Sequence, residues 1–146
     1  MIDLLVVGGG PVGLVTALEA TERGLSVAVV DRRVGDGDKA CGEGLMPSAV
    51  AALAALGVDP PGRDLRGIRY LGGGRLAAAQ FTGPPGRGVR RTTLVSVLRE
   101  RLDAAGVPRL QGTVASLDQR HDWVDAAGVQ ARYVAVADGL HSPLRR

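Results

Sequence analysis

The sequence predicts an α/β fold built on a parallel sheet, and three stretches support this. Residues 2–7 form an apolar run that ends in three glycines, residues 12–23 are rich in helix-forming Ala and Leu, and residues 26–30 form a second apolar run. Continuous apolar runs of this length are typical of strands buried on both faces. Two such strands joined by a helix within about 30 residues must be parallel.

The middle of the chain shows shorter and more broken patterns. Pro47 stands at an expected first helical turn and Gly57 after its end, as helices often begin and end. In chain order we expect a loop at 32–46, a helix at 47–56, a connector at 59–62, two short strands within 67–81 and a loop at 83–88.

The last third begins with an amphipathic helix at 92–105. Its apolar side chains recur every three or four residues, and Gly106 follows as a stop signal. These apolar positions are Leu94, Val97, Leu98 and Leu102. Short strands with turns near 119–122 and 127–128 then predict an antiparallel β-meander, inserted before a last apolar strand at 133–137.

Composition excludes several classes of protein. The chain has 146 residues, a net charge of +3 and 3% aromatic residues, and its basic residues are scattered, so we expect no nucleic-acid partner. No apolar run approaches the ~18 residues that span a bilayer. Cys41 is the only cysteine and no signal peptide is visible, so we expect a cytoplasmic protein of one domain. No cluster with metal-ligand spacing occurs, so no metal is expected.

Residues 8–13, Gly-Gly-Gly-Pro-Val-Gly, fit the pattern G-x-G-x-x-G between the first strand and the first helix. In this context the glycines permit a tight turn, a close approach of pyrophosphate and close helix packing, and the helix N-terminus attracts the phosphates. Asp31 ends the second strand, where a carboxylate binds ribose hydroxyls. The motif predicts an adenine dinucleotide and leaves FAD and NAD open. Its candidate contacts are Gly8, Gly10, Pro11, Val12, Gly13, Asp31, Arg32 and Arg33.

A carboxylate at Asp31 disfavours the 2′-phosphate of NADP, although Arg32 and Arg33 could accept one. The last apolar strand ends in Asp138-Gly139, followed by Ser142 and Arg145. An acidic residue at the carboxyl end of a central parallel strand stands where open α/β sheets bind ligands. Gly139 permits a sharp turn after it.

Two further segments carry polar or reactive groups. Arg91 begins Arg-Thr-Thr-Leu at the start of the long helix, and a guanidinium there can bond two oxygens of a pyrophosphate. Residues 38–47, Asp-Lys-Ala-Cys-Gly-Glu-Gly-Leu-Met-Pro, contain Cys41 and Gly42. No base is identifiable for a nucleophilic Cys41, and we interpret Glu43 as a solvated loop charge.

Together these segments resemble the front portion of the p-hydroxybenzoate-hydroxylase-type flavoproteins, a superfamily that includes aromatic hydroxylases, geranylgeranyl reductases and flavin halogenases. The resemblance implies a Rossmann-like FAD-binding fold, with FAD contacts at Asp138, Gly139 and Arg91 and a flavin-proximal loop at Cys41 and Gly42. Val114 completes the set of candidate cofactor-binding residues. No catalytic residue is assigned.

The resemblance also implies that flavin is reduced by NAD(P)H. The flavin then serves either hydroxylation of a small organic substrate or reduction of an isoprenoid double bond. The family's second flavin motif and its substrate region are not found in residues 1–146, so we expect an incomplete FAD-binding domain with an open apolar sheet edge. The alternative is a non-catalytic, truncated or split dinucleotide-binding fragment, completed by a partner chain. An NAD-sensing domain would not need the Asp138 segment.

Overall fold

The computed structural model describes residues 1–33, 38–39 and 41–145. The chain divides into two compact units. The first consists of Met1–Gly37 and Val95–Arg146, and the second of Asp38–Leu94.

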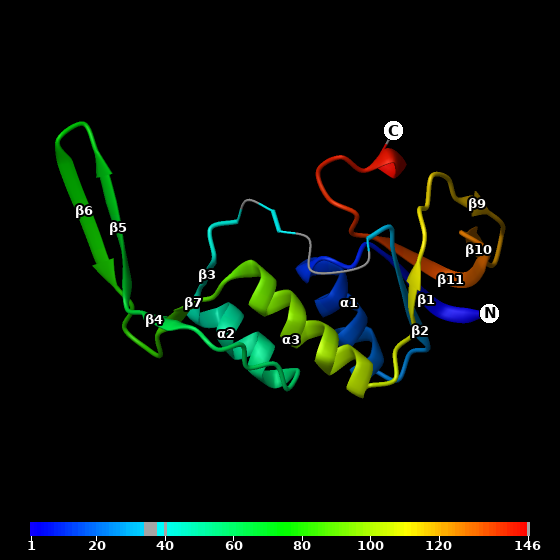
Figure 1. The fold of residues 1–146 in the computed structure, drawn as a ribbon, viewed down its shortest axis with the longest axis horizontal. Helices are drawn as coiled ribbons and strands as arrows, with labels where there is room; N and C mark the ends of the chain where they lie inside the picture. Colours follow the sequence, from blue (N-terminus) through cyan, green and yellow to red (C-terminus); the bar gives the residue numbers. More distant parts are fainter. Residues whose placement is uncertain (34–37, 40, 146) are drawn as a thin grey trace. The chain divides into compact units, whose positions relative to one another are not determined.

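The sheet of the first unit has the strand order β8-β2-β1-β11-β10-β9 (Figure 1). Its first four strands in that order are parallel, with Val6 of β1 opposite both Val29 of β2 and Ala135 of β11. The strands are β1 (Ile2–Val7), β2 (Val27–Asp31), β8 (Arg109–Gln111), β9 (Asp118–Gln119), β10 (Val124–Ala126) and β11 (Val129–Val136). The parallel sheet expected from the apolar runs is confirmed.

The predicted β-meander continues the same sheet. The strands β9, β10 and β11 pair in antiparallel fashion, and β11 then runs parallel to β1. We expected the last strand to begin at Tyr133, but it begins at Val129. One strand therefore serves both the meander and the parallel core, because its amino-terminal residues pair with β10 across the turn at Ala127 and Gly128.

Helix α1 (Pro11–Glu22) lies against one face of this sheet, as Figure 1 shows. Leu14, Ala17 and Leu18 of α1 are buried, and alternate strand residues such as Val6 point towards this helix. The opposite face of the sheet carries a second apolar cluster. That cluster consists of Leu5, Val7, Ala28, Val30, Val114, Ala126 and Ala131.

Helix α3 (Arg91–Ala104) begins in the second unit and continues into the first, where Leu98 and Leu102 are fully buried. Arg101 of α3 pairs with Glu22 at the end of α1 at 2.5 Å. After β11 the chain ends in a short 3₁₀ helix, η1 (Pro143–Arg145). Within the part of the chain that the structure describes, no helix is long and apolar enough to cross a bilayer.

The second unit contains α2 (Pro47–Ala55), the strand order β3-β7-β4 and a separate hairpin of β5 and β6. The helix and the hairpin match the predicted elements. The strands β3 (Gly44–Leu45) and β7 (Gly86–Gly88) lie where we expected loops, and β4 (Arg63–Leu65) lies just after the expected connector, in a stretch for which we expected no element. They are two or three residues long, and their partners are up to 44 residues away, so no local pattern marks them.

The hairpin comprises β5 (Gly67–Gly72) and β6 (Arg75–Gln80). Leu71 pairs with Leu76, and the turn residues Gly73 and Gly74 both have positive φ angles, of 55° and 71°. A two-residue turn with positive φ at both positions matches the twist of a hairpin.

Candidate nucleotide site

Gly8 brings the carboxyl ends of three strands together. Its N–H donates to the carbonyl of Val30 at 2.8 Å, and Ala137 donates to the carbonyl of Val7 at 2.7 Å. Its φ angle is 114°, and a Cβ at this position would collide with the carbonyl of Ala137 and lie 2.8 Å from the nitrogen of Asp138. Only glycine fits here, because both the backbone conformation and the space exclude a side chain.

The N-terminus of α1 is built as an anion site. Gly10 is its N-cap and Pro11 its first residue, and among the described residues no side chain caps this end. The first helical hydrogen bond runs from Leu14 N–H to the Gly10 carbonyl at 2.9 Å. The amides of the first turn therefore remain for an anion, which the helix dipole also attracts. Val12 in this turn is exposed.

Gly13 fixes how closely the helix approaches the glycine turn. A Cβ at Gly13 would overlap the carbonyl oxygen of Gly8 and lie 3.2 Å from a methyl group of Val6. The role expected of the last glycine, close packing between helix and strand, is therefore visible in these contacts.

Asp31 ends β2 beside the glycine turn. Its Oδ2 accepts from Gly9 N–H at 2.5 Å, and its Oδ1 accepts from Arg33 N–H at 2.8 Å. A carboxylate offers about four lone-pair sites, so two remain for other donors such as ribose hydroxyls. The structure thus brings together the glycine turn and the acidic residue 22 positions away. Arg32 and Arg33 follow and are both exposed.

Asp138 and Gly139 lie at the same edge of the sheet. Asp138 is half-buried and follows the strand end that Gly8 contacts. Gly139 has a φ of 93°, so the sharp turn expected there is present. Buried Ser142 organises the loop, since its N–H donates to the Gly139 carbonyl and its Oγ accepts from Leu144 N–H, both at 3.2 Å.

The second unit brings Cys41, Gly42 and Arg91 into one local segment. Arg91 N–H donates to Oε1 of Glu43 at 3.1 Å, and Val89 N–H donates to the Glu43 carbonyl at 2.8 Å. Cys41 is an exposed free thiol and Gly42 is exposed. Glu43 is exposed too, but it is more than the solvated charge that we expected, because it holds this loop to the first residue of α3.

No sequence signal could have revealed that contact of Glu43, since it joins residues 48 positions apart. The residue also has a φ of 52°, which is unusual for a side chain other than glycine. Val114 presents a different case. Its side chain is 4% exposed and belongs to the apolar cluster of the sheet, so any cofactor contact at this position must use its backbone.

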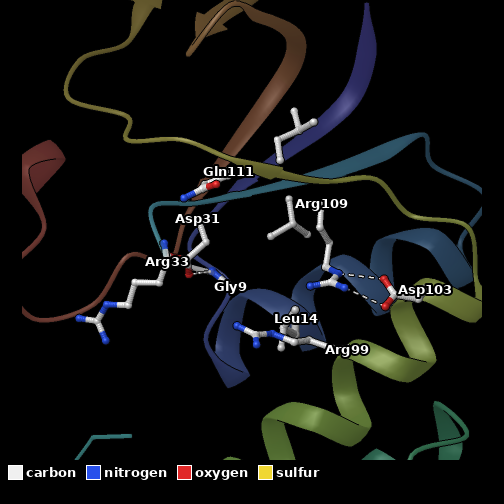
Figure 2. A pocket seen from close by; sticks show the side chains of 10 residues that line it. Gly9, Leu14, Asp31, Arg33, Arg99, Asp103, Arg109 and Gln111 are labelled. Atoms are coloured by element: carbon white, nitrogen blue, oxygen red, sulfur yellow. Dashed lines mark hydrogen bonds and ion pairs between the residues drawn. The ribbon is translucent and has the colours of Figure 1, made fainter. Parts of the chain in front are cut away.

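A pocket of about 300 Å³ opens beside Asp31 in the first unit (Figure 2). Besides Asp31 and Arg33, it is lined by charged and polar residues that the motifs did not indicate. These are Arg99 and Asp103 of α3 and Arg109 and Gln111 of β8. Arg99 and Asp103 are four residues apart on a helix, which on sequence alone resembles any solvated helix face. Among the described residues, no three His, Cys, Asp or Glu side chains gather as metal ligands would.

Comparisons with known proteins identify the family of this chain. A family model described as "FAD binding domain" matches residues 1–146. The menaquinone reductase of Mycobacterium tuberculosis is 35% identical over 99% of this chain, and the geranylgeranyl diphosphate reductase of Rhodobacter capsulatus is 29% identical over 98% of it. The chain spans 39% of the length of each.

A solved structure shares both fold and sequence similarity. The p-nitrophenol 4-monooxygenase PnpA of Pseudomonas putida superposes with a TM-score of 0.81 at 26% identity, over 96% of this chain and 41% of its own. The Rossmann-like fold expected from the motifs is therefore confirmed.

Proposed function

Because this chain belongs to the FAD-binding domain family, which matches all of its residues, we propose that the glycine turn, Asp31 and Asp138 hold FAD. The observation that carries this proposal is the N-terminus of α1, which no described side chain caps and which follows a glycine turn that contacts both the Asp31 carboxylate and the Asp138 strand end. Amides and a helix dipole suit the pyrophosphate, and the carboxylate suits the ribose hydroxyls.

The residues present fit this cofactor. Gly8 and Gly13 leave no room for side chains where the turn and helix meet, while the first-turn amides of Val12 and Gly13, which follow Pro11, meet no capping side chain among the described residues. We assign Arg91 to the pyrophosphate and the Cys41–Gly42 loop to the neighbourhood of the flavin. Asp138 and Gly139 are assigned to the flavin side of the sheet edge, and Val114 to a backbone contact.

For the reaction, we propose an oxidoreductase that takes hydride from NAD(P)H. When bound, FAD supplies a ring that accepts reducing equivalents and passes them to a second substrate, while the protein binds and orients both. Because Asp31 belongs to the FAD cradle in this proposal, it does not decide between NADH and NADPH as the electron donor.

The second substrate that we propose is an isoprenoid with a carbon–carbon double bond. The support comes from the names of two relatives, a menaquinone reductase and a geranylgeranyl diphosphate reductase. Residues 41–47 add to it, because they resemble the Cys-Gly-x-Gly-Leu-x-Pro loop of geranylgeranyl-reductase-like proteins. Hydroxylation of a small aromatic substrate is the competing activity, which the likeness to a p-nitrophenol monooxygenase supports.

The complete product of the encoding gene tests the reaction. Under anaerobic conditions, NADH or NADPH should bleach the flavin absorbance, and addition of a menaquinone should restore it with loss of one side-chain double bond by mass spectrometry. If menaquinone does not reoxidise the flavin, but oxygen together with an aromatic substrate does and a hydroxylated aromatic product forms, the activity is instead that of a monooxygenase.

A second candidate is a nucleotide-binding chain that acts with a partner chain. Residues 1–146 span 39% of the length of the menaquinone reductase, and this candidate assigns the rest of the site to a second chain. Affinity purification from the source organism tests it, since a co-purifying chain that resembles the remaining part of the relatives supports this candidate, and a single longer polypeptide rejects it.

We propose the cytoplasm as the location. Cys41 is exposed and unpaired, as is usual for thiols in a reducing compartment. Cell fractionation with detection of the chain tests this, and recovery from a secreted fraction would contradict it.

A further inference from the structure

The pairing of β2 with β8 fixes which side chains point into the pocket beside Asp31. Val29 pairs with Arg109 and Asp31 pairs with Gln111 across the parallel strands β2 and β8. Paired residues share a face of the sheet, and so do residues two positions apart along a strand. Arg109 and Asp31 therefore project from the same face, on neighbouring strands, with Val29 beside them.

Arg109 is held in a fixed plane. Its Nε donates to Oδ1 of Asp103 and its Nη2 donates to Oδ2, both at 2.8 Å. This two-bond contact joins the first residue of β8 to the last turn of α3, as Figure 2 shows. Bidentate arginine–carboxylate contacts restrict the orientation of the guanidinium, which a single hydrogen bond does not.

Asp103 remains ionised in this arrangement. The hydrogen bond from Arg109 lowers the pKa of the Asp103 carboxyl, and the charges of Arg109 and Arg99 lower it further. Burial raises this pKa and offsets part of the effect. The contact with Arg109 therefore persists at neutral pH.

The two ends of the pocket have complementary chemistry. Figure 2 shows Asp31 on one side of the pocket, where its carboxylate keeps lone pairs for hydroxyl donors, and the guanidinium of Arg109 on the other. Leu14 and Val29 also line the pocket, but both side chains are almost fully buried, so the groups accessible to a ligand are mainly the polar ones. A ribose carries hydroxyl donors and a purine carries a flat π face, against which guanidinium groups pack well. An adenosine matches this order of groups.

We propose that Arg109 is a wall of the adenosine pocket and that Asp103 is the positioning residue that orients it. The assignment rests on the proposed function, because the adenosine is that of FAD. It adds residues of α3 and β8 to the part of the site that the glycine turn and Asp31 form. A phosphate on the ribose 2′-oxygen is the competing ligand for these arginines, but Asp103 already engages Arg109, and Asp31 repels such a phosphate.

The experiment uses the 146-residue chain and the variants Arg109→Lys and Asp103→Asn. Lysine keeps the charge but loses the plane, and asparagine loses one acceptor and the charge. Asp118→Asn is the matched control, since it weakens an aspartate–arginine pair of 2.7 Å with Arg120 outside the pocket. Calorimetric titrations measure binding of FAD, ADP and inorganic pyrophosphate, with adenosine 2′,5′-bisphosphate titrated into the parent chain, and thermal melting of each variant checks folding.

We expect both pocket variants to weaken FAD and ADP by a similar factor of about ten, the order of a partly desolvated guanidinium–ring contact. Pyrophosphate binding should stay unchanged, because the groups assigned to it do not include Arg109 or Asp103, and Asp118→Asn should bind all three ligands as the parent chain does. A merely structural role of the pair would not separate ADP from pyrophosphate.

The outcomes separate the two proposals. FAD affinity that is unchanged in both folded variants overturns the adenosine wall and leaves FAD binding intact. A parent chain that binds ADP but not FAD, with ADP weakened in the variants, keeps the wall and rejects the proposed function. Tighter binding of adenosine 2′,5′-bisphosphate than of ADP overturns the wall, because the arginines would then hold a phosphate. A parent chain that binds neither FAD nor ADP overturns both.

Discussion

The glycine turn of the first unit and the hairpin of the second use the same residue type for different purposes. At Gly8 and Gly13 a Cβ would collide with backbone carbonyls, whereas at Gly72 the described part of the chain offers nothing within 4 Å of that position. In the turn, glycine is required because the strands and helix are pressed together. In the hairpin, glycine only shapes a solvated bend.

Apolar residues show the same contrast. Leu5 in β1 is 0% exposed, while Leu71 and Leu76 of the hairpin are 75% and 59% exposed. Burial, not residue type, decides what a leucine contributes to stability. The turn and its sheet are therefore the rigid base of the site, and substitutions there should have consequences that matching substitutions in the hairpin do not.

The largest expected effect is on the sheet core. Leu5→Ala should lower the free energy of unfolding by about 2–5 kcal/mol, since it removes buried methyl groups and leaves a cavity. Leu71→Ala should change it by less than about 0.5 kcal/mol, because the side chain is already solvated. Urea unfolding of both variants measures the difference, and equal losses would show that the hairpin is as buried as the sheet.

The next effect concerns the glycine turn. Gly13→Ala should cost about 1–3 kcal/mol from the forced shift of the Gly8 carbonyl, and it should weaken FAD binding because the helix N-terminus moves. Gly72→Ala should be close to neutral in both respects. Denaturant titration together with FAD fluorescence checks this pair, and a stable Gly13→Ala chain with parental FAD affinity would remove the steric argument.

A smaller effect is expected at Asp31. Asp31→Asn should weaken FAD binding by roughly tenfold, the order of one charge-assisted hydrogen bond, with little change in fold. The matched control is Asp64→Asn in the second unit, whose carboxylate pairs with Arg66 at 3.6 Å on an exposed surface. If the asparagine at 31 leaves the FAD dissociation constant unchanged, the ribose role of Asp31 is wrong.

The smallest effect is a pH dependence at the amino ends of the strands. Hydrogen bonds from the Ser26 hydroxyl and amide lower the pKa of Asp3 from its ordinary 3.8, with a weaker contribution from Arg132. The stability that this carboxylate contributes is present above pH 3.8 and is lost as the pH falls through its folded value. Acid unfolding of Asp3→Asn should therefore begin from a lower stability near neutral pH and approach the parent curve in acid. Free energies of unfolding that differ by the same amount at every pH would contradict this.

Much of the first unit was predictable because its signals are local. The strand, glycine turn, helix and second strand within residues 2–31 follow from apolar runs and glycines, and burial on both faces enforces them. Gly139 was predictable because a turn after Asp138 demands a positive φ.

The remainder depends on contacts that no local pattern carries. The strand β7 is three residues long and is defined by partners at Leu45 and Leu65. Glu43 and the Asp103–Arg109 pair lie on exposed segments, so their part in the site follows only from the positions of their partners in space.

Retention of FAD by the purified chain is the most direct test of the central claim. The 146-residue chain is mixed with excess FAD and separated from it by gel filtration, and visible absorbance and circular dichroism are recorded on the protein fraction. We expect flavin absorbance to co-elute with the folded chain and to be reduced for Asp31→Asn. A folded chain that elutes without flavin would contradict the assignment of the glycine turn, Asp31 and Asp138 to FAD.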